Sequence, residues 1–292
     1  MDKIKLIIWD LDDTFWQGTI SEGEIKPNPK NISLVRELAL HGVMSSICSK
    51  NDFEVAKKKL IELDIWDYFI FPSIDWTNKG ERVGQMLDSI HLQAKNTLFV
   101  DDNKTNLAEV KFYSPEIHTA LPEQMYDYIK ENAYMDKPDK SLFRLRQYKI
   151  MESAEYERKR IGDDRLFLEQ SNIKCEIIRD WENETDRAYK ILQRTSQLNF
   201  TKRAATKESV REYLTTADDS GLIRVVNKYG DYGFVGFFAL RKGELQQFAF
   251  SCRIMGMGVE QFVYATLGFP KIKVTEPVTS ILNKIEKPGW IS

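Results

Sequence analysis

Cysteine is scarce in this chain. Only Cys48, Cys175 and Cys252 occur among 292 residues, and they lie far apart. None of them forms a pair at the spacing of a metal site. An odd number of widely separated cysteines argues against disulfide bonds, which form and persist in oxidising compartments. We therefore expect a reducing, cytoplasmic location.

Long apolar runs are also lacking. The N-terminal segment MDKIKLIIWDLDD contains an apolar run that is too short for the hydrophobic region of a signal peptide. No stretch approaches the roughly 20 apolar residues that cross a bilayer. The sequence therefore predicts no membrane span.

Neither sign of charge is in large excess. The chain has 42 basic and 44 acidic residues and a formal net charge of −2. Proteins that bind nucleic acid through their overall charge have a strong excess of basic residues. We therefore expect no nucleic-acid partner.

The first half of the chain alternates between apolar runs and helical patterns. The apolar runs predict strands at residues 4–9, 43–48, 68–71 and 97–100, and the intervening patterns predict helices at 29–40, 52–63 and 79–90. Strands that alternate with helices of this length are typical of βαβ units. We predict an α/β domain over residues 1–135, built on a doubly wound parallel sheet.

The pattern changes in the second half. Residues 136–172 are charged and favour helix, which predicts a helical connector. Residues 173–292 follow as an α+β domain, with a strand at 174–178, a helix at 184–194 and a three-stranded antiparallel meander over 223–251 that turns near Gly230 and Gly243. A strand at 271–275 and a short helix at 279–286 complete the prediction. Two domains also suit a chain of this length.

Three carboxylates follow predicted strands of the first domain. Asp10 and Asp12 belong to a D-x-D-x-T motif directly after the first strand, and Asp101 follows the fourth. Ligands of open α/β sheets bind at these strand ends. A carboxylate that attacks phosphorus needs its own charge and that of the phosphate neutralised, and a hard cation held by oxygen ligands does this. The pattern indicates a Mg²⁺ site for phosphoryl transfer.

Two further side chains suit a phosphate. Ser49 ends the second strand, where its hydroxyl and the backbone N–H groups of Lys50 and Asn51 can donate to phosphate oxygens. Lys79 opens a helix and offers a cation for the charge that develops in transfer. Each motif taken alone is as compatible with a solvent-exposed turn as with a catalytic site. Their order, each at or just after a βα junction, favours a catalytic site.

These residues resemble the haloacid dehalogenase (HAD) superfamily. Its four motifs match Asp10/Asp12/Thr14, Ser49, Lys79 and Asp101/Asp102. The match implies that Thr14 binds the phosphate and that Asp102 supports the metal site. The resemblance implies that Asp10 forms an aspartyl-phosphate and that Asp12 protonates the leaving group and then activates water. It also implies that Mg²⁺ is held by Asp10, Asp101 and the backbone carbonyl of Asp12.

The predicted site has no cap. The stretch between Asp12 and Ser49 is mostly one loop and one helix, with no room for a cap domain. We expect an open site that accommodates a large or protein-borne substrate.

A glycine motif occurs in the second domain. Arg253, Gly256 and Gly258 form R-x-x-G-x-G between a predicted strand and a predicted helix at 259–267. Glycines have no side chain, so they leave backbone N–H groups exposed at a helix N-terminus, where these groups form an anion site suited to a pyrophosphate. This resembles the acyl-CoA loop of the acetyltransferase-like (GNAT-like) fold and implies binding of CoA or phosphopantetheine. A simple glycine turn is the alternative.

Together the two halves resemble the FkbH-like proteins, in which a capless HAD domain of subfamily IIIC type precedes a GNAT-like domain. The matching blocks are WDLDDTFWQGTISEG, CSKND, FVDDN, RTSQLNFTKR and FSCRIMGMGVE. Some relatives load a glyceryl group onto an acyl carrier protein through a cysteine between the two motif aspartates. Here that position is Leu11, and of the remaining candidate thiols Cys48 is expected to pack in a strand and Cys252 to line the loop. We also expect the closing strands of the GNAT-like fold to be missing or incomplete.

Three functions remain open. The first is a Mg²⁺-dependent phosphohydrolase or phosphotransferase in a biosynthetic pathway, such as polyketide or surface and capsular polysaccharide assembly, acting on a phosphorylated small molecule or a carrier-bound substrate. The second is a glyceryl or acyl transferase that acts on an acyl carrier protein. The third is a non-catalytic scaffold that binds a carrier. The intact set of acidic residues and Lys79 counts against the third, and Leu11 counts against the second.

Overall fold

The chain folds into two units of different architecture, Met1–Glu152 and Ser153–Ser292. The computed structural model describes residues 3–133, 135 and 138–292. Residue 136, at the predicted start of the connector, lies outside the described residues. None of the helices described is both long enough and apolar enough to cross a membrane.

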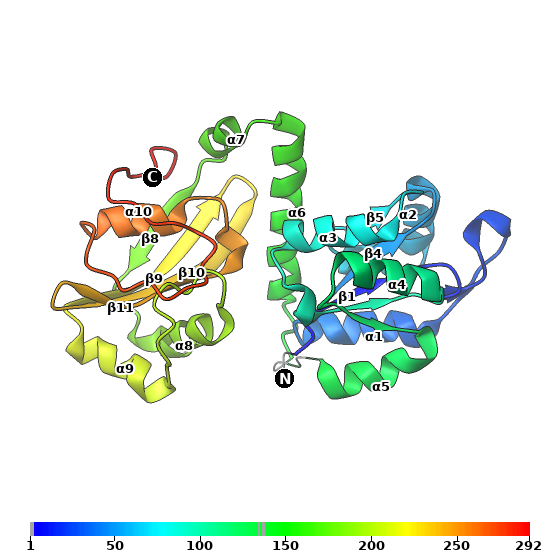
Figure 1. Ribbon diagram of the computed structural model, residues 1–292, viewed down its shortest axis with the longest axis horizontal. Helices are drawn as coiled ribbons and strands as arrows, with labels where there is room; N and C mark the ends of the chain where they lie inside the picture. The colour runs from blue at the N-terminus through cyan, green and yellow to red at the C-terminus, as the bar shows by residue number, and fades with distance from the viewer. Residues whose placement is uncertain (1–2, 134, 136–137) are drawn as a thin grey trace. The chain divides into compact units, whose positions relative to one another are not determined.

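The first unit is an α/β fold (Figure 1). Its strands are β1 (Leu6–Trp9), β2 (Trp16–Gln17), β3 (Lys26–Pro27), β4 (Met44–Ser49), β5 (Ser73–Ile74), β6 (Thr97–Val100) and β7 (His118–Ala120). Its helices are α1 (Pro29–Leu40), α2 (Phe53–Glu62), α3 (Lys79–Ile90), α4 (Lys104–Tyr113) and α5 (Pro122–Asn132). The helix α6 (Phe143–Ile161) begins in this unit and ends in the second.

The main sheet of this unit confirms the predicted doubly wound fold. Its five strands are parallel in the order β5-β4-β1-β6-β7. All four residues of β1 are buried, as expected for a strand covered on both faces. The chain proceeds from β1 to β4 and β5 on one side and then crosses to β6 and β7 on the other. The switch point therefore lies at the carboxyl end of β1, where ligands of such sheets bind.

Helices cover both faces of this sheet. Ile7 and Trp9 of β1 belong to an apolar cluster with residues of α1, α2 and α5. The helices α3 and α4 pack against each other and against β4 and β6. Alternate residues of β1 thus point into different apolar layers. Burial of each large side chain contributes about 1.5–3 kcal/mol.

One predicted strand of the first unit is wrong. Residues 68–71 do not form a regular strand: a 3₁₀ helix ends at Tyr68, Phe69 makes one isolated bridge to Ser45, and the strand β5 lies further on. Phe71 has a φ of 46°, and its backbone N–H donates to Glu152 Oε1 at 2.9 Å. A left-handed residue interrupts an extended segment. Phe69 and Ile70 are buried, but the run does not pair as a strand along its length.

The second unit is an α+β fold. Its elements are α7 (Asp164–Gln170), β8 (Lys174–Ile178), α8 (Thr185–Arg194), α9 (Lys207–Thr216), β9 (Asp219–Asn227), β10 (Gly230–Arg241), β11 (Glu244–Phe250) and α10 (Val259–Thr266). The four strands form an antiparallel sheet in the order β11-β10-β9-β8. The predicted strand at 174–178 and the predicted meander are confirmed. Lys242 and Gly243 both have positive φ, as a tight hairpin turn requires.

The core of the second unit lies between this sheet and two helices. Ala188 and Leu192 of α8 and Val210 of α9 pack with Phe237 and Ala239 of β10. Polar residues on the other side of α8 and α9 remain exposed, so these are amphipathic helices that cover one face of the sheet.

Two predictions near the C-terminus are wrong. Residues 271–275 form no strand, although Lys271 makes one isolated parallel bridge to Glu244. Residues 279–286 form no helix, because side chains take the place of helical hydrogen bonds: Gln261 Oε1 accepts from the Asn283 backbone, and Asn283 Oδ1 accepts from the backbones of Ile285 and Glu286. Such local bonds compete with a helix.

Candidate active site

Three adjacent strands of the first unit end in predicted site residues. Asp10 follows β1, Ser49 ends β4 on one side of it, and Asp101 follows β6 on the other. Parallel strands place their carboxyl ends at one edge of the sheet, so the fold brings these three residues together. Asp10 and Asp101 are both buried, and Ser49 donates a side-chain hydrogen bond to Asp10.

Lys79 joins the two carboxylates. Its Nζ lies 2.6 Å from Asp10 Oδ1 and 2.7 Å from Asp101 Oδ2, and its side chain is only 2% exposed. The lysine is the first residue of α3, which approaches the sheet edge directly after the β5 loop. Burying three charged groups costs free energy, and the pairing of the ammonium with both carboxylates offsets that cost.

Burial and neighbouring charges shift the pKa values of both Asp10 and Lys79. Burial raises the pKa of Asp10 to about 6; the negative charge of Asp101 acts in the same direction, and Lys79 and Ser49 oppose it. Burial alone would lower the pKa of Lys79, but the charges of Asp10 and Asp101 outweigh it and raise that pKa above its usual value. Lys79 therefore carries a positive charge at neutral pH.

The acidic residues suit a divalent metal ion. Asp10, Asp101 and Asp102 each offer a carboxylate oxygen, and these atoms lie within 4.8 Å of one another. Three carboxylates outweigh the single charge of Lys79, and oxygen donors are those that Mg²⁺ prefers. The donor set therefore fits Mg²⁺. The carboxylate of Asp12 is not in this group, and its predicted role as a ligand through the backbone carbonyl remains a prediction.

The carboxylate of Asp12 is held by three donors. Oδ1 accepts from Trp16 Nε1 at 2.9 Å and from the Ile20 backbone N–H at 3.2 Å. Oδ2 accepts from Asn51 Nδ2 at 3.1 Å, and the same Nδ2 also donates to Ser49 Oγ. Asn51, which we predicted to bind phosphate, thus links Asp12 to Ser49.

Thr14 and Asp102 contact each other. The Thr14 hydroxyl accepts from the Asp102 backbone N–H at 3.0 Å and donates to Asp102 Oδ1 at 3.4 Å. Thr14 is buried, so this pair ties the loop after β1 to the loop after β6. Lys50 is half-buried beside Ser49. The predicted phosphate contacts of Thr14 and Lys50 remain predictions.

The sequence patterns did not reveal three further side chains that hold this site. Asn106 Nδ2 donates to Asp101 Oδ1 at 3.1 Å and to Oδ2 at 3.2 Å. The buried Arg82 donates to the backbone carbonyls of Ser49 and Asp75, which fixes the loop before α3. Trp16 is the third. Of the three, only Asn106 could have been suspected from the sequence, because it lies in the first turn of the helix that follows Asp101.

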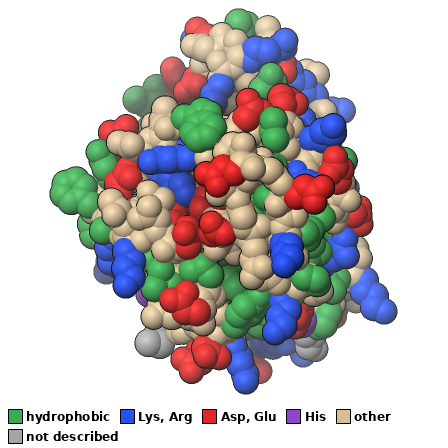
Figure 2. All heavy atoms as spheres, turned by 90° about the vertical axis from the view of Figure 1, so that its right-hand side faces the viewer, with side chains coloured by type: hydrophobic (Ala, Val, Ile, Leu, Met, Phe, Trp, Pro, Cys, Tyr) green, Lys and Arg blue, Asp and Glu red, His purple; other side chains and the backbone are tan. Residues whose placement is uncertain are grey.

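Figure 2 shows a face of the molecule on which acidic side chains gather near the centre, with Lys and Arg side chains beside them. Side chains of both charges therefore lie beside each other on this face.

The glycine motif of the second unit has part of the expected geometry. Gly256 and Gly258 have φ of 74° and 78°, and Gly258 is the N-cap of α10. Arg253, however, donates to the carbonyls of Tyr232 and Phe234 at 2.8 and 3.2 Å. In this structure the guanidinium ties the loop to β10, and a phosphate would have to compete with those bonds.

The chain's own C-terminal segment lies against this loop. A Cβ built on Gly258 would come within 3.2 Å of Trp290 Cζ2 and 3.4 Å of Pro288 Cγ. Trp290 Nε1 also donates to the Met257 carbonyl at 2.9 Å. A ligand at Gly258 would therefore meet residues 288–290, and the predicted binding of CoA or pantetheine remains a prediction.

Glu260, at the start of α10, is a buried acid. Its Oε1 accepts from Ser280 Oγ at 2.5 Å, whereas Oε2 is buried with no partner among the described residues. Burial raises the pKa of this carboxyl. The native state then binds the proton more tightly than the unfolded chain, so this stabilisation is present in acid and is lost as pH rises through the raised pKa.

We expect Glu260→Gln to gain stability relative to the wild type as pH rises from 4 to 8, because the amide cannot ionise. The matched control is Glu208→Gln at the same position of α9, where Glu208 is exposed and its pKa is lowered by backbone and side-chain hydrogen bonds. The control should show the opposite trend. Urea-unfolding midpoints across this pH range measure both, and parallel curves for Glu260→Gln and the wild type would contradict the expectation.

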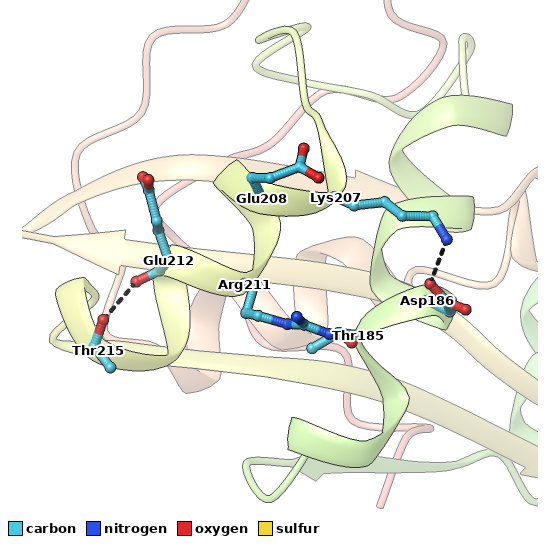
Figure 3. A pocket seen from close by; sticks show the side chains of 7 residues that line it. All are labelled: Thr185, Asp186, Lys207, Glu208, Arg211, Glu212 and Thr215. Carbon is cyan, nitrogen blue, oxygen red and sulfur yellow. Dashed lines mark hydrogen bonds and ion pairs between the residues drawn. The ribbon is translucent and has the colours of Figure 1, made fainter.

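A separate hollow of about 660 Å³ lies between α8 and α9. Figure 3 shows the Lys207–Asp186 ion pair at one side and Arg211 reaching from α9 towards Thr185 on α8. Glu208 and Glu212 also line it. Its charges are mixed, and none of the predicted site residues lines it.

Comparisons with known proteins give partial likenesses. No family model matches the chain, and no curated protein matches it. One similar structure is the N-terminal part of a Bacteroides fragilis protein containing a phosphatase domain, complexed with Mg, at 19% identity and a TM-score of 0.42 over 47% of this chain and 42% of that chain. Another is the cobalt-bound deoxy-D-mannose-octulosonate 8-phosphate phosphatase of Haemophilus influenzae, at 13% identity and a TM-score of 0.34 over 47% of this chain and 82% of that chain. With scores this low, neither likeness assigns a family or an activity to the chain.

Proposed function

We propose that the first unit is a Mg²⁺-dependent phosphohydrolase of the HAD type with Asp10 as its nucleophile. The observation that carries this proposal is the Lys79 ammonium held 2.6 Å from Asp10 and 2.7 Å from Asp101 at the ends of neighbouring strands. A buried nucleophile beside a cation and further carboxylates suits attack on a phosphate ester.

The first half of the reaction transfers the phosphoryl group to Asp10. A carboxylate oxygen of Asp10 attacks phosphorus, and the bond from phosphorus to the leaving oxygen breaks. Protonated Asp12 gives its proton to that oxygen, so the product leaves as an alcohol. Lys79 and the Ser49 hydroxyl lie beside Asp10, where they can stabilise the transferred oxygens.

The second half releases phosphate. The Asp12 carboxylate takes a proton from water, the water oxygen attacks phosphorus, and the bond from phosphorus to Asp10 breaks. This step regenerates both aspartates. An acceptor other than water would make the same site a phosphotransferase.

Asp10, Asp101 and Asp102 would hold the metal ion. A bound Mg²⁺ supplies positive charge that neutralises the phosphate and orients it towards the nucleophile. Asn106 and the Asn103 backbone N–H fix the orientation of Asp101 through hydrogen bonds of 2.8–3.2 Å. Such supporting bonds keep a ligand in place.

Hydrolysis is favoured over transfer through a thioester. Leu11, between the two motif aspartates, is buried and has no thiol. Cys48 is buried in β4, as predicted, and burial raises the pKa of its thiol to about 12. A thiol with such a pKa forms almost no thiolate at neutral pH and is a poor nucleophile.

The pathway and the second unit form the finer part of the proposal. The FkbH-like sequence blocks support a role in polyketide or in surface or capsular polysaccharide assembly, with a phosphorylated small molecule or carrier-bound substrate. The R-x-x-G-x-G loop and the positive φ of its glycines support a module that contacts CoA or the phosphopantetheine arm of an acyl carrier protein. The engaged side chain of Arg253 counts against acyl transfer by this unit.

Removal of the metal tests the proposed function. With a panel of phosphomonoesters, chelator should reduce phosphate release to background, and excess Mg²⁺ should restore it. Ca²⁺ should restore much less, because the larger ion accepts looser coordination and positions the nucleophile less well. Chelator premixed with excess Mg²⁺ is the control. Activity without a divalent ion, or equal restoration by both ions, would rule out this site.

A further inference from the structure

The two oxygens of Asp12 have different environments. Oδ1 accepts two hydrogen bonds, from Trp16 Nε1 at 2.9 Å and from the Ile20 backbone at 3.2 Å. Oδ2 accepts one, from Asn51 at 3.1 Å. A carboxylate oxygen has two lone pairs. Oδ1 is therefore fully occupied, and the remaining lone pair belongs to Oδ2.

The donor on Oδ1 has a fixed direction. Trp16 is 1% exposed and pairs with Pro27 in the β2–β3 hairpin. Its ring packs edge-to-face on Phe15 with centroids 6.2 Å apart. A buried indole in a packed core has one orientation, so its N–H points at Asp12 with little freedom.

We propose that Trp16 is a positioning residue for acid–base catalysis: its indole N–H holds Oδ1 of Asp12, so that Oδ2 is the atom that carries the transferred proton. This inference rests on the proposed function. Trp16 thereby has a role that the D-x-D-x-T motif alone does not predict.

Proton transfer then proceeds through one oxygen. In the first half of the reaction the bond from Oδ2 to its proton breaks as the leaving oxygen takes the proton. In the second half Oδ2 takes a proton from the attacking water, so the group returns to its initial state. Loss of the indole N–H leaves Oδ1 with the Ile20 backbone N–H as its single donor, so the carboxyl group rotates more easily. This rotation lowers the fraction of molecules with a proton aimed at the leaving oxygen.

The dependence on the leaving group tests this role. Trp16→Phe keeps an aromatic ring but removes the N–H. We measure kcat/KM with p-nitrophenyl phosphate, whose leaving group departs without a proton, and with propyl phosphate, whose leaving group needs one.

Because kcat/KM covers only the steps through departure of the leaving group, the later attack of water does not affect its value. We expect the ratio of kcat/KM for the aryl ester to that for the alkyl ester to rise about tenfold, a part of the roughly 10²–10⁴-fold that general acid catalysis supplies.

Trp9→Phe is the matched control. Trp9 is also a buried tryptophan of the same apolar cluster, but its N–H donates to Ser45 Oγ at 3.2 Å. This variant should leave the ratio within about twofold of the wild type, because general acid catalysis is untouched.

Ile20→Pro removes the other donor to Oδ1 and serves as a second variant in case Trp16→Phe does not fold. Thr19 already has the extended backbone that precedes proline, with φ −107° and ψ 121°. This variant should raise the ratio in the same direction.

The outcomes separate the two proposals. A rise in the ratio for Trp16→Phe or Ile20→Pro, without one for Trp9→Phe, supports the positioning role. Equal losses with both esters, or no loss with either, would overturn it while the phosphatase activity of the wild type stands. Absence of activity in the wild type with both esters and Mg²⁺ would overturn the proposed function, and the inference with it.

Discussion

Asp10→Asn should abolish phosphate release and leave the first unit folded. The amide cannot attack phosphorus, and it removes one charge that a cation needs. We expect a loss of roughly 10⁴-fold or more in kcat, as for nucleophiles of other enzymes. The fold should persist because the new amide would keep an oxygen near Ser49 and Lys79, and a buried charge is removed.

Asp13→Asn is the matched control for this experiment. Asp13 lies in the same loop, is exposed, and has a φ of 50° that asparagine adopts readily. Its Oδ1 accepts from the Gly18 backbone at 2.7 Å, which the amide oxygen can also do. Phosphate release by this control should remain near that of the wild type. Near wild-type turnover by Asp10→Asn would show that the nucleophile is a different residue.

Lys79→Met should have a large effect on both stability and activity. The ammonium lies between two buried carboxylates, and methionine leaves Asp10 and Asp101 without their positive partner. Removing one partner of a buried ion pair costs about 3–5 kcal/mol. Activity should also fall to background, because the charge beside the transferred phosphoryl group is lost. Urea unfolding and phosphate release measure the two effects.

Mg²⁺ provides a further test of Lys79. Added Mg²⁺ should restore part of the stability of Lys79→Met, because a cation bound by the same carboxylates replaces the missing charge. The control is Lys104→Met, at the first residue of α4, where the side chain is exposed. It should change the free energy of unfolding by less than about 0.5 kcal/mol. An unchanged stability of Lys79→Met would contradict the strong coupling of these three groups.

The fold of the first unit could be predicted because its signals are local. The strands before Asp10 and Asp101 consist of apolar residues apart from Thr97, as strands buried on both faces require, and each is followed by a carboxylate. Helices α1 and α3 have the predicted bounds. The wrong strand at residues 68–71 has the same apolar composition. Its failure depends on the left-handed Phe71 and on Glu152, a partner distant in sequence.

The partners of the site residues could not be predicted in the same way. Asp12 follows the motif, but its contact with Asn51 depends on how β1 and β4 pair. The glycines of the second unit have the expected positive φ, which is a local property. The bonds of Arg253 to β10 join residues about 20 positions apart and have no signature in the motif.

The order of chemical groups along this chain was determined by sequence alone. Carboxylates, a serine and a lysine follow successive strands, and βα units place such residues at one edge of a parallel sheet. Tertiary structure decided what each group contacts. Lys79 reaches both Asp10 and Asp101, Trp16 holds Asp12, and Trp290 lies over the glycine loop. The physical reason is that periodicity reports which residues are buried, whereas the geometry of a hydrogen bond depends on how distant segments pack.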